Sequence, residues 1–282
     1  MEALAIAPDL LAHDWLGASR RAAAGLRGVL AGRPTSAERC EETGGRGEGG
    51  DRTLVIDAQA EDVVFGELAR LHEAGARFTA ISEERGTVHF GDDTVRVVID
   101  PIDGSLNAKR GLPHHALSIA VADGPTMADV VFGYVFDLGP GEEWHAVRGQ
   151  GAYLDGERLD PPAERRRRDK LEVVAVESAD PRHLAASAQA LCDVTGRVRA
   201  LGSIAVSLCQ VAATRVDGMA TLWRSRAVDA AAGQLIVRES GGVVEFGLED
   251  PLGAPLDLEP HEPVIAARTP ESLALLRTLP AR

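Results

Sequence analysis

The sequence predicts a mixed α/β protein, with an antiparallel sheet in its first half and alternating strands and helices in its second half. Three observations support this fold class. Apolar residues recur at helical spacing near the N-terminus, strand-like runs crowd together between residues 78 and 148, and strands alternate with helices after residue 170. Pro161-Pro162 and the basic run Arg165–Arg168 indicate a linker between the two patterns. We therefore expect an α+β domain over residues 1–164 and an α/β domain over residues 165–282.

Two helices are predicted before the first sheet. Apolar side chains at helical spacing indicate a helix over residues 9–30, and Gly32 follows it as a stop. A second helix is expected from Thr53 to about Ala74, with Gly75 at its C-terminal end.

A polar, glycine-rich loop is expected between these helices, over residues 43–51. Its Gly44–Gly50 stretch satisfies the G-x-G-x-x-G pattern of dinucleotide-binding proteins. That pattern indicates a cofactor site only directly after a strand, and the segment before it is rich in alanine and charge. We therefore interpret the loop as a flap beside the functional site, and a nicotinamide-dependent dehydrogenase remains only as an alternative that this loop alone supports.

The strands of the first half are short apolar runs bounded by turn residues. Gly139-Pro140-Gly141 is typical of a hairpin turn between the last two of them. The expected strands are Phe78–Ser82, Val95–Ile99, Ala116–Ala122, Val130–Leu138 and Glu142–Arg148.

The second half alternates strands with helices, which is typical of βα units. A short strand is expected between the first two helices, and further strands and a helix complete the chain. The other expected elements are strands at Leu171–Val176 and Val216–Leu222 and helices over residues 181–193, Ser203–Thr214 and 229–240.

Composition excludes several classes of partner. A formal charge of −13 argues against binding to nucleic acid or to an anionic membrane. No apolar stretch approaches the length that spans a membrane. Cys40, Cys192 and Cys209 are odd in number and show no metal-like spacing, which fits the reducing cytoplasm. We expect a cytoplasmic protein whose ligand is a small molecule.

The most informative stretch is Val97–Asn107, in which a hydrophobic strand ends in two carboxylates three residues apart, Asp100 and Asp103. Two carboxylates this close repel each other unless a cation neutralises them, and Mg²⁺ suits such a pair. Pro101 restricts the backbone between them. Gly104-Ser105 can open a helix, whose free N–H groups attract an anion. The segment predicts a metal site built against a phosphate-binding turn.

Other carboxylates admit ordinary structural interpretations. Glu83 and Glu84 follow the Phe78–Ser82 strand and are typical of a solvated strand end. Asp229 precedes an alanine-rich helix, where Asp is a preferred N-cap residue. Asp57 and Glu61 lie four residues apart on one helix face, which usually forms a solvated stripe. Their order around the Asp-Pro-Ile-Asp-Gly-Ser motif favours a functional role instead.

These motifs together resemble the inositol monophosphatase superfamily of Mg²⁺-dependent sugar and nucleotide phosphatases. Ser82-Glu83-Glu84 is similar to the family's Gly-Glu-Glu box, and Asp100–Ser105 to its Asp-Pro-Ile/Leu-Asp-Gly-Thr/Ser box. Ala227–Gly233 resembles its Trp-Asp-x-Ala-Ala-Gly box, and Glu239–Gly242 matches the Glu-Ala-Gly-Gly that ends that helix. The resemblance runs from about Asp51 to Gly242 and implies a layered αβαβα sandwich of the sugar phosphatase type.

The resemblance also implies roles for individual residues. Asp57 and Ser105 correspond to the acid–hydroxyl pair that orients the attacking water. The N–H groups of Gly104 and Ser105, together with Asn107 in the same motif, are implied in substrate binding. The implied cofactor is Mg²⁺, with Mn²⁺ as a substitute, and a homodimer is expected. The implied metal ligands are Glu83, Asp100, the backbone carbonyl of Ile102, Asp103 and Asp229.

Departures from the family pattern bear on the substrate. Thr221–Trp223 contains no carboxylate equivalent to the Glu that binds inositol hydroxyls, and Arg224 and Arg226 precede Asp229 instead. This pattern resembles dual-activity members that cleave fructose-1,6-bisphosphate as well as inositol monophosphate, since arginine forks suit a second phosphate. Both arginines could instead form ordinary surface ion pairs. A nucleotide phosphatase of the 3′-phosphoadenosine type, a histidinol phosphatase or a non-catalytic regulatory member of the same fold remains an alternative.

Overall fold

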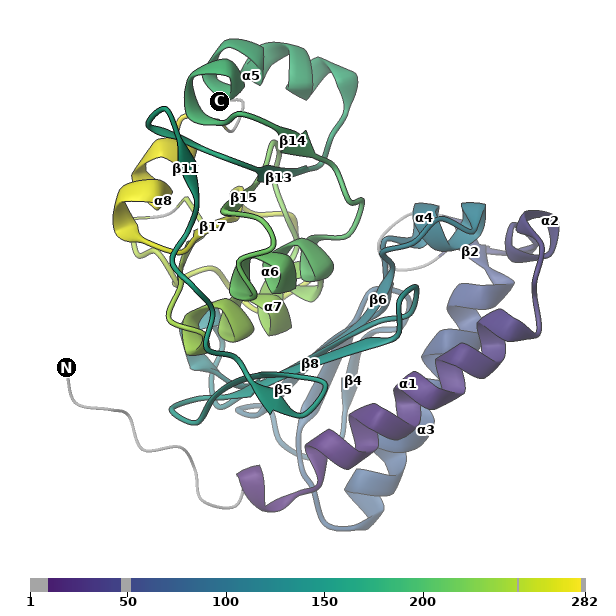
Figure 1. Cartoon of the computed structure of the whole chain (residues 1–282). Helices are drawn as coiled ribbons and strands as arrows, with labels where there is room; N and C mark the ends of the chain where they lie inside the picture. The colour runs from purple at the N-terminus through teal and green to yellow at the C-terminus, as the bar shows by residue number, and fades with distance from the viewer. Residues whose placement is uncertain (1–9, 47–51, 248, 280–282) are drawn as a thin grey trace.

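The computed structural model describes residues 10–46, 52–247 and 249–279. The main elements stack in five alternating layers, αβαβα, as the resemblance implied (Figure 1). Two sheets alternate with three layers of helices, because each sheet has apolar side chains on both faces and both must be covered. The helices are α1 (Trp15–Ala31) and α3 (Val55–Glu73) outside the large sheet, α6 (Ile204–Ala212) and α7 (Ala227–Glu239) between the sheets, and α5 (Pro181–Val194) and α8 (Pro270–Leu276) beyond the small sheet.

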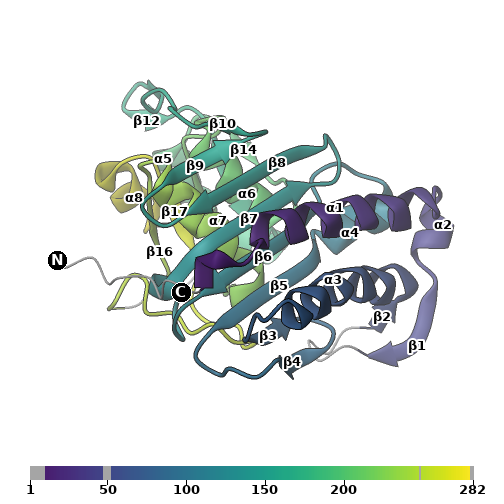
Figure 2. The ribbon, with the colours of Figure 1, turned by 90° about the horizontal axis from the view of Figure 1, so that it is seen from below.

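The large sheet has eight strands in the order β10-β9-β8-β7-β6-β5-β3-β4. Only β3 and β5 run parallel among its neighbouring pairs, and α1 and α3 cross its outer face (Figure 2). All five strands expected in the first half form part of this sheet. Its strands are β3 (Thr79–Ser82), β4 (Gly86–His89), β5 (Arg96–Asp103), β6 (Ala116–Ala122), β7 (Val130–Asp137), β8 (Glu142–Val147), β9 (Gly151–Leu154) and β10 (Glu157–Arg158).

The small sheet has five strands in the order β14-β13-β15-β17-β16. β13 runs parallel to β14 and β15, whereas β17 is antiparallel to both of its neighbours. The alternation of strands and helices expected in the second half is confirmed. The strands are β13 (Val174–Glu177), β14 (Val198–Arg199), β15 (Gly218–Thr221), β16 (Val243–Glu245) and β17 (Ile265–Ala267). The described residues also form the short helices α2 (Ser36–Arg39) and α4 (Ser105–Arg110) and 3₁₀ turns at Leu10–Ala12 and Met127–Asp129.

Two expectations for loops were wrong. β1 (Glu42–Arg46) pairs with β2 (Arg52–Leu54), so part of the expected glycine-rich loop is a strand, and residues 47–51 lie outside the described residues. The following helix therefore begins at Val55 rather than at Thr53. The expected linker at Arg165–Arg168 also contains a strand. There β11 (Arg166–Arg167) pairs with β12 (Lys170–Leu171) through a turn whose two residues, Arg168 and Asp169, have positive φ.

Strand β5 shows why its sequence is apolar without alternation. Val97 and Ile99 pack in the cluster beneath α1 and α3, whereas Val98 packs in the cluster around α6 and α7. Successive side chains of a strand point to opposite faces, so a strand covered on both faces is apolar throughout. The end of β5 is consequently held firmly from both sides.

Helix α7 occupies the centre of the molecule. Every residue from Ala227 to Val237 is buried, and the helix contacts β5–β9 as well as β16. Gly133 of β7 allows this approach, since a Cβ there would lie 2.7 Å from the carbonyl oxygen of Ala232. The apolar cluster around α7 includes strands of both sheets. Among the described residues, no helix combines the length and apolar character needed to cross a membrane.

Candidate metal centre and active site

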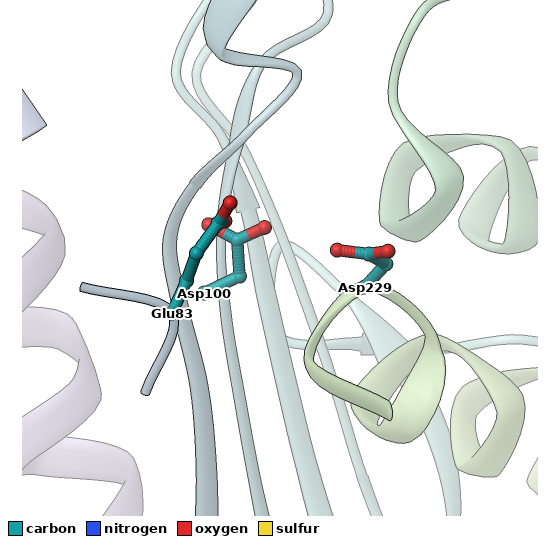
Figure 3. A group of neighbouring side chains, drawn as sticks. All are labelled: Glu83, Asp100 and Asp229. Carbon is teal, nitrogen blue, oxygen red and sulfur yellow. The ribbon is translucent and has the colours of Figure 1, made fainter. Parts of the chain in front are cut away.

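Three carboxylates from distant parts of the sequence meet beside the end of β5. β3 and β5 are parallel neighbours with Ser82 opposite Ile99, so the next residues, Glu83 and Asp100, emerge at the same sheet edge. Asp229 approaches from the first turn of α7 (Figure 3). One oxygen from each carboxylate lies within 4.8 Å of the other two. The order of acidic motifs in the sequence thus corresponds to a cluster in space.

The end of β5 is irregular where the two aspartates lie. Asp100 and Asp103 both pair with β6, but the register shifts between them. Pro101 has no backbone N–H to donate, and the N–H of Ile102 donates to Asp100 Oδ1 at 2.9 Å instead of joining the ladder. This turn places both aspartates, and the carbonyl of Ile102 between them, beside the same edge of the sheet.

Asp103 is not one of the three clustered carboxylates, and its side chain is held at the start of α6. Its Oδ2 accepts hydrogen bonds from Ser203 Oγ at 2.6 Å and from the N–H of Ala205 at 2.7 Å. Asp229 is still close enough to raise the pKa of Asp103. The sequence predicted α6 but gave no sign that its N-terminus supports an acidic residue of the first half.

Burial and mutual repulsion make this group of carboxylates reluctant to ionise together. Burial, followed by Glu83 and Asp103, raises the pKa of Asp100 well above its usual range. Burial and then Asp229 raise the pKa of Asp103 to about 8. Burial also raises the pKa of Asp229, although Arg226 opposes this effect. Such a site is stabilised by a cation, and its all-oxygen donors suit a hard divalent ion such as Mg²⁺.

Arg226 supplies positive charge to the same cluster. Its guanidinium donates to Glu83 at 2.7 Å and to Asp229 at 3.2 Å, and its side chain is 27% exposed. The N–H of Arg226 also donates to Asp229 Oδ2 at 3.3 Å, which fixes the first turn of α7. A protein cation thus bridges two candidate metal ligands, which shows that the donor set accepts positive charge. Arg224 is exposed, and among the described residues Arg226, not Arg224, is the ion-pair partner of Glu83 and Asp229.

A cavity beside the cluster contains the acid–hydroxyl pair expected from the sequence. Asp57, from the first turn of α3, and Ser105, from the start of α4, both line it. Burial, and then Glu84, raises the pKa of Asp57 to about 6. Lys109 is a lining cation that the sequence analysis did not select. The cavity is lined by Asp57, Glu83, Glu84, Asp100, Pro101, Ile102, Ser105 and Lys109.

Gly104 makes the sharp turn between Asp103 and α4. Its φ is +86°, which favours glycine, and a Cβ would lie 2.8 Å from the carbonyl oxygen of Gly202 and 2.9 Å from that of His114. Asn107 fastens this region, because its Nδ2 donates to the carbonyls of Pro113, His114 and Leu201. Asn107 therefore stabilises the neighbouring turns, a structural role that the sequence analysis, which expected a contact with substrate, did not predict.

Glu61 does not lie on a solvated stripe, which is the ordinary interpretation of its spacing from Asp57. Its side chain is only 1% exposed. It accepts hydrogen bonds from Ser82 Oγ and from the N–H of Glu84 at 3.3 Å, and it forms an ion pair with Arg85 at 3.1 Å. Glu61 therefore holds the turn that carries Glu83. The i, i+4 spacing could not reveal this, because the partners come from a strand end distant in sequence.

Comparison with known proteins agrees with this architecture. The Inositol monophosphatase family profile matches residues 14–279. The chain is 34% identical over 209 residues to a fructose-1,6-bisphosphatase/inositol-1-monophosphatase of Methanothermobacter thermautotrophicus, covering 70% of this chain and 72% of that protein. It is 36% identical over 202 residues to the Nus factor SuhB of Escherichia coli, covering 69% and 71% of the two chains.

A solved structure shares the fold. The crystal structure of an inositol monophosphatase–fructose 1,6-bisphosphatase superposes with a TM-score of 0.80 at 24% identity, covering 94% of this chain and 99% of that one. Because the matched profile spans nearly the whole chain and the acidic motifs meet as one cluster, this protein belongs to the inositol monophosphatase family.

Proposed function

We propose that this protein is a Mg²⁺-dependent phosphomonoester hydrolase acting on small sugar or polyol phosphates. The observation that carries the proposal is the convergence of Glu83, Asp100 and Asp229 beside a cavity that also holds Asp57 and Ser105. Family membership supports hydrolysis as the reaction class. Glu83, Asp100, the carbonyl of Ile102, Asp103 and Asp229 would hold the metal, with Mn²⁺ able to replace Mg²⁺.

The residues around the metal site would have separate roles in activating water and binding the phosphoryl group. When bound, Mg²⁺ would supply positive charge that lowers the pKa of a water molecule and polarises the phosphoryl group. Asp57, with a pKa near 6, is a base of suitable strength to take the proton of that water, through the hydroxyl of Ser105. The N–H groups at the start of α4, from Gly104 and Ser105, would donate to phosphoryl oxygens.

Fructose-1,6-bisphosphate and inositol monophosphate are the proposed substrates. The archaeal relatives named for both activities support this choice. Lys109 lines the cavity, and Arg224 is exposed three residues before α7 begins, so both are candidates to bind a second anionic group. Arg226 is paired with Glu83 and Asp229. It would be free to bind a substrate anion only when a metal cation replaces it as the partner of these two carboxylates.

A phosphate-release assay over a panel of sugar, polyol and nucleotide phosphates tests the proposal. We expect release only with Mg²⁺ or Mn²⁺ present, and the highest kcat/KM for fructose-1,6-bisphosphate. Full activity after EDTA treatment would refute the metal assignment. A protein that binds Mn²⁺ but releases no phosphate would instead support the non-catalytic alternative.

Two variants separate metal binding from the orientation of water. Asp103→Asn removes a ligand charge and should abolish turnover and weaken Mn²⁺ binding, measured by titration calorimetry. Ser105→Ala removes only a hydroxyl and should lower kcat while largely sparing Mn²⁺ affinity. Equal loss of Mn²⁺ affinity in both variants would contradict these roles.

The proposal also includes a cytoplasmic homodimer. Cys40 and Cys192 are exposed free thiols and Cys209 is a buried one, which suits a reducing compartment. Light scattering of the purified protein will give the mass of the assembly, and a monomer at micromolar concentration would refute the dimer.

A further inference from the structure

Glu177, at the end of β13, is a buried carboxylate that the proposed chemistry does not use. Its side chain is 3% exposed. It accepts hydrogen bonds from the N–H groups of Leu201 at 3.0 Å and Gly202 at 2.9 Å, and from Ser207 Oγ at 2.6 Å. A buried carboxylate with three donors fixes the segments that supply them, because each donor would otherwise lie unpaired away from water.

The turn that Glu177 holds leads directly to the donors of Asp103. Ser203 follows Gly202, and both Ser203 Oγ and the N–H of Ala205 donate to Asp103 Oδ2. Ser203 Oγ also accepts a hydrogen bond from the N–H of Val206 at 3.1 Å, which caps α6. A short, continuous set of bonds therefore joins Glu177 in the small sheet to an aspartate at the end of the large sheet.

The same turn is fixed from its other side, so it has little room to move. Asn107 Nδ2 donates to the carbonyl of Leu201 at 2.6 Å. Gly202 has φ +83°, and a Cβ there would lie 2.7 Å from Asn107 Nδ2. A Cβ on Gly104 would lie 2.8 Å from the carbonyl oxygen of Gly202. Displacement of the turn would consequently shift the segment that begins at Asp103.

We propose that Glu177 is a positioning residue for the metal centre. By binding Leu201 and Gly202, it places Ser203 and Ala205 on Oδ2 of Asp103 and so orients that carboxylate toward the cation. Glu177 itself touches no reacting atom. This inference rests on the proposed function, because it assumes that Asp103 helps to hold the metal.

Asp217 provides a matched control for Glu177. It is 4% exposed and accepts hydrogen bonds from the N–H groups of Arg165 at 2.8 Å and Val173 at 2.9 Å. β13 and β15 pair in parallel, with Glu177 opposite Thr221, whereas Asp217 directly precedes β15. The two carboxylates thus make similar hydrogen bonds at opposite ends of two neighbouring parallel strands. Of the two, only Glu177 lies at the end that faces the metal site.

The experiment compares Glu177→Gln with Asp217→Asn. Each carboxylate accepts hydrogen bonds on both of its oxygens, whereas an amide has only one oxygen to accept with, so both variants should lose thermal stability. Removing a group that orients a metal ligand typically costs about 10–100-fold in metal affinity or activity. We expect Glu177→Gln, but not Asp217→Asn, to weaken Mn²⁺ binding about tenfold, measured without substrate. The same variant should lower kcat with little change in KM. Ser203→Ala, which removes the last donor of the path, should weaken Mn²⁺ binding as well.

The outcomes distinguish a failure of the positioning role of Glu177 from a failure of the proposed phosphatase function. If wild-type protein neither binds Mn²⁺ nor releases phosphate, the proposed function fails. If wild type does both while Glu177→Gln and Asp217→Asn retain equal Mn²⁺ affinity and kcat, the positioning role is overturned. If Glu177→Gln does not fold, the Mn²⁺ affinity of Ser203→Ala is the test. Wild-type affinity in that variant would refute the proposed connection from Glu177 through Ser203 to Asp103.

Discussion

At the scale of single residues, the site is organised by the need to balance buried negative charge. Asp100, Asp103 and Asp229 are all less than a tenth exposed. One serine hydroxyl, backbone N–H groups and one guanidinium compensate them in part. The raised pKa values of all three show that this compensation is incomplete. The remaining imbalance would stabilise the divalent ion that we propose for this site.

Arg226→Ala should increase the affinity for Mn²⁺, because Arg226 holds two of the candidate ligands. Two unit charges 4 Å apart interact by about 4 kcal/mol at an effective dielectric constant of about 20. Partial exposure of Arg226 weakens this interaction, so we expect about tenfold tighter binding by titration calorimetry. The variant should also melt at a lower temperature in EDTA, where nothing replaces the lost charge.

Arg224→Ala is the control for this prediction. It removes the same charge two residues earlier, from an exposed side chain that has no ion pair with Glu83 or Asp229. A gain in Mn²⁺ affinity equal to that of Arg226→Ala would show a general field effect rather than competition for Glu83 and Asp229.

The stability of metal-free protein should depend on pH through Asp103. Its pKa of about 8 lies above the usual range, so the unfolded chain gives up this proton at lower pH than the folded chain. Stability is therefore lost as pH rises from about 4 towards 8. In EDTA, Asp103→Asn should gain melting temperature relative to wild type between about pH 6 and pH 9. A constant difference between the two proteins would contradict the buried, charged state of Asp103.

At the scale of elements, the two tight glycine turns, at Gly104 and Gly202, determine how α4 and α6 meet. Gly104→Ala would place a methyl group against the carbonyls of Gly202 and His114, in a backbone conformation that already costs about 1–2 kcal/mol for alanine. We expect a loss of several kcal/mol in the free energy of unfolding, measured with urea, together with weaker Mn²⁺ binding.

Gly111 ends the same short helix and supplies the comparison. Its φ is +68°, but a Cβ there would meet nothing within 4 Å. Gly111→Ala should therefore cost only the backbone strain, about 1–2 kcal/mol, and leave Mn²⁺ affinity unchanged. Similar losses in both variants would show that backbone strain, not contact between the turns, dominates.

The same scale shows what the sequence could and could not predict. The apolar run before Asp100 predicted β5 and its carboxylate end, because a strand covered on both faces leaves a strong local pattern. The strands β4 and β9 were not predicted, because both are only partly buried and lack the apolar run that marked β3, a strand of the same length. The burial of Glu61 and the engagement of Arg226 depend on partners distant in sequence. Local patterns located the acidic residues, and only tertiary contacts could show what surrounds them.

At the scale of the whole molecule, the central apolar cluster joins the two sheets through α6 and α7. We expect a single cooperative unfolding transition, with equal calorimetric and van't Hoff enthalpies. Leu273→Ala, in the outer helix α8, should cost about 2–5 kcal/mol and lower that transition as a whole. Two separate transitions in the variant would show that the two expected domains, residues 1–164 and 165–282, unfold independently.

The central place of α7 also bears on how the protein matures in the cell. Chains emerge from the ribosome N-terminus first, so Glu83 and Asp100 are available well before Asp229 and Arg226 have been made. Until then the growing chain carries Glu83, Asp100 and Asp103 without Asp229 and without the guanidinium of Arg226 between them. If the proposed metal site is correct, a complete site forms only after α7 has inserted between the sheets, late in synthesis. A nascent chain would remain inactive until that step, and gain of activity would mark the completion of its folding.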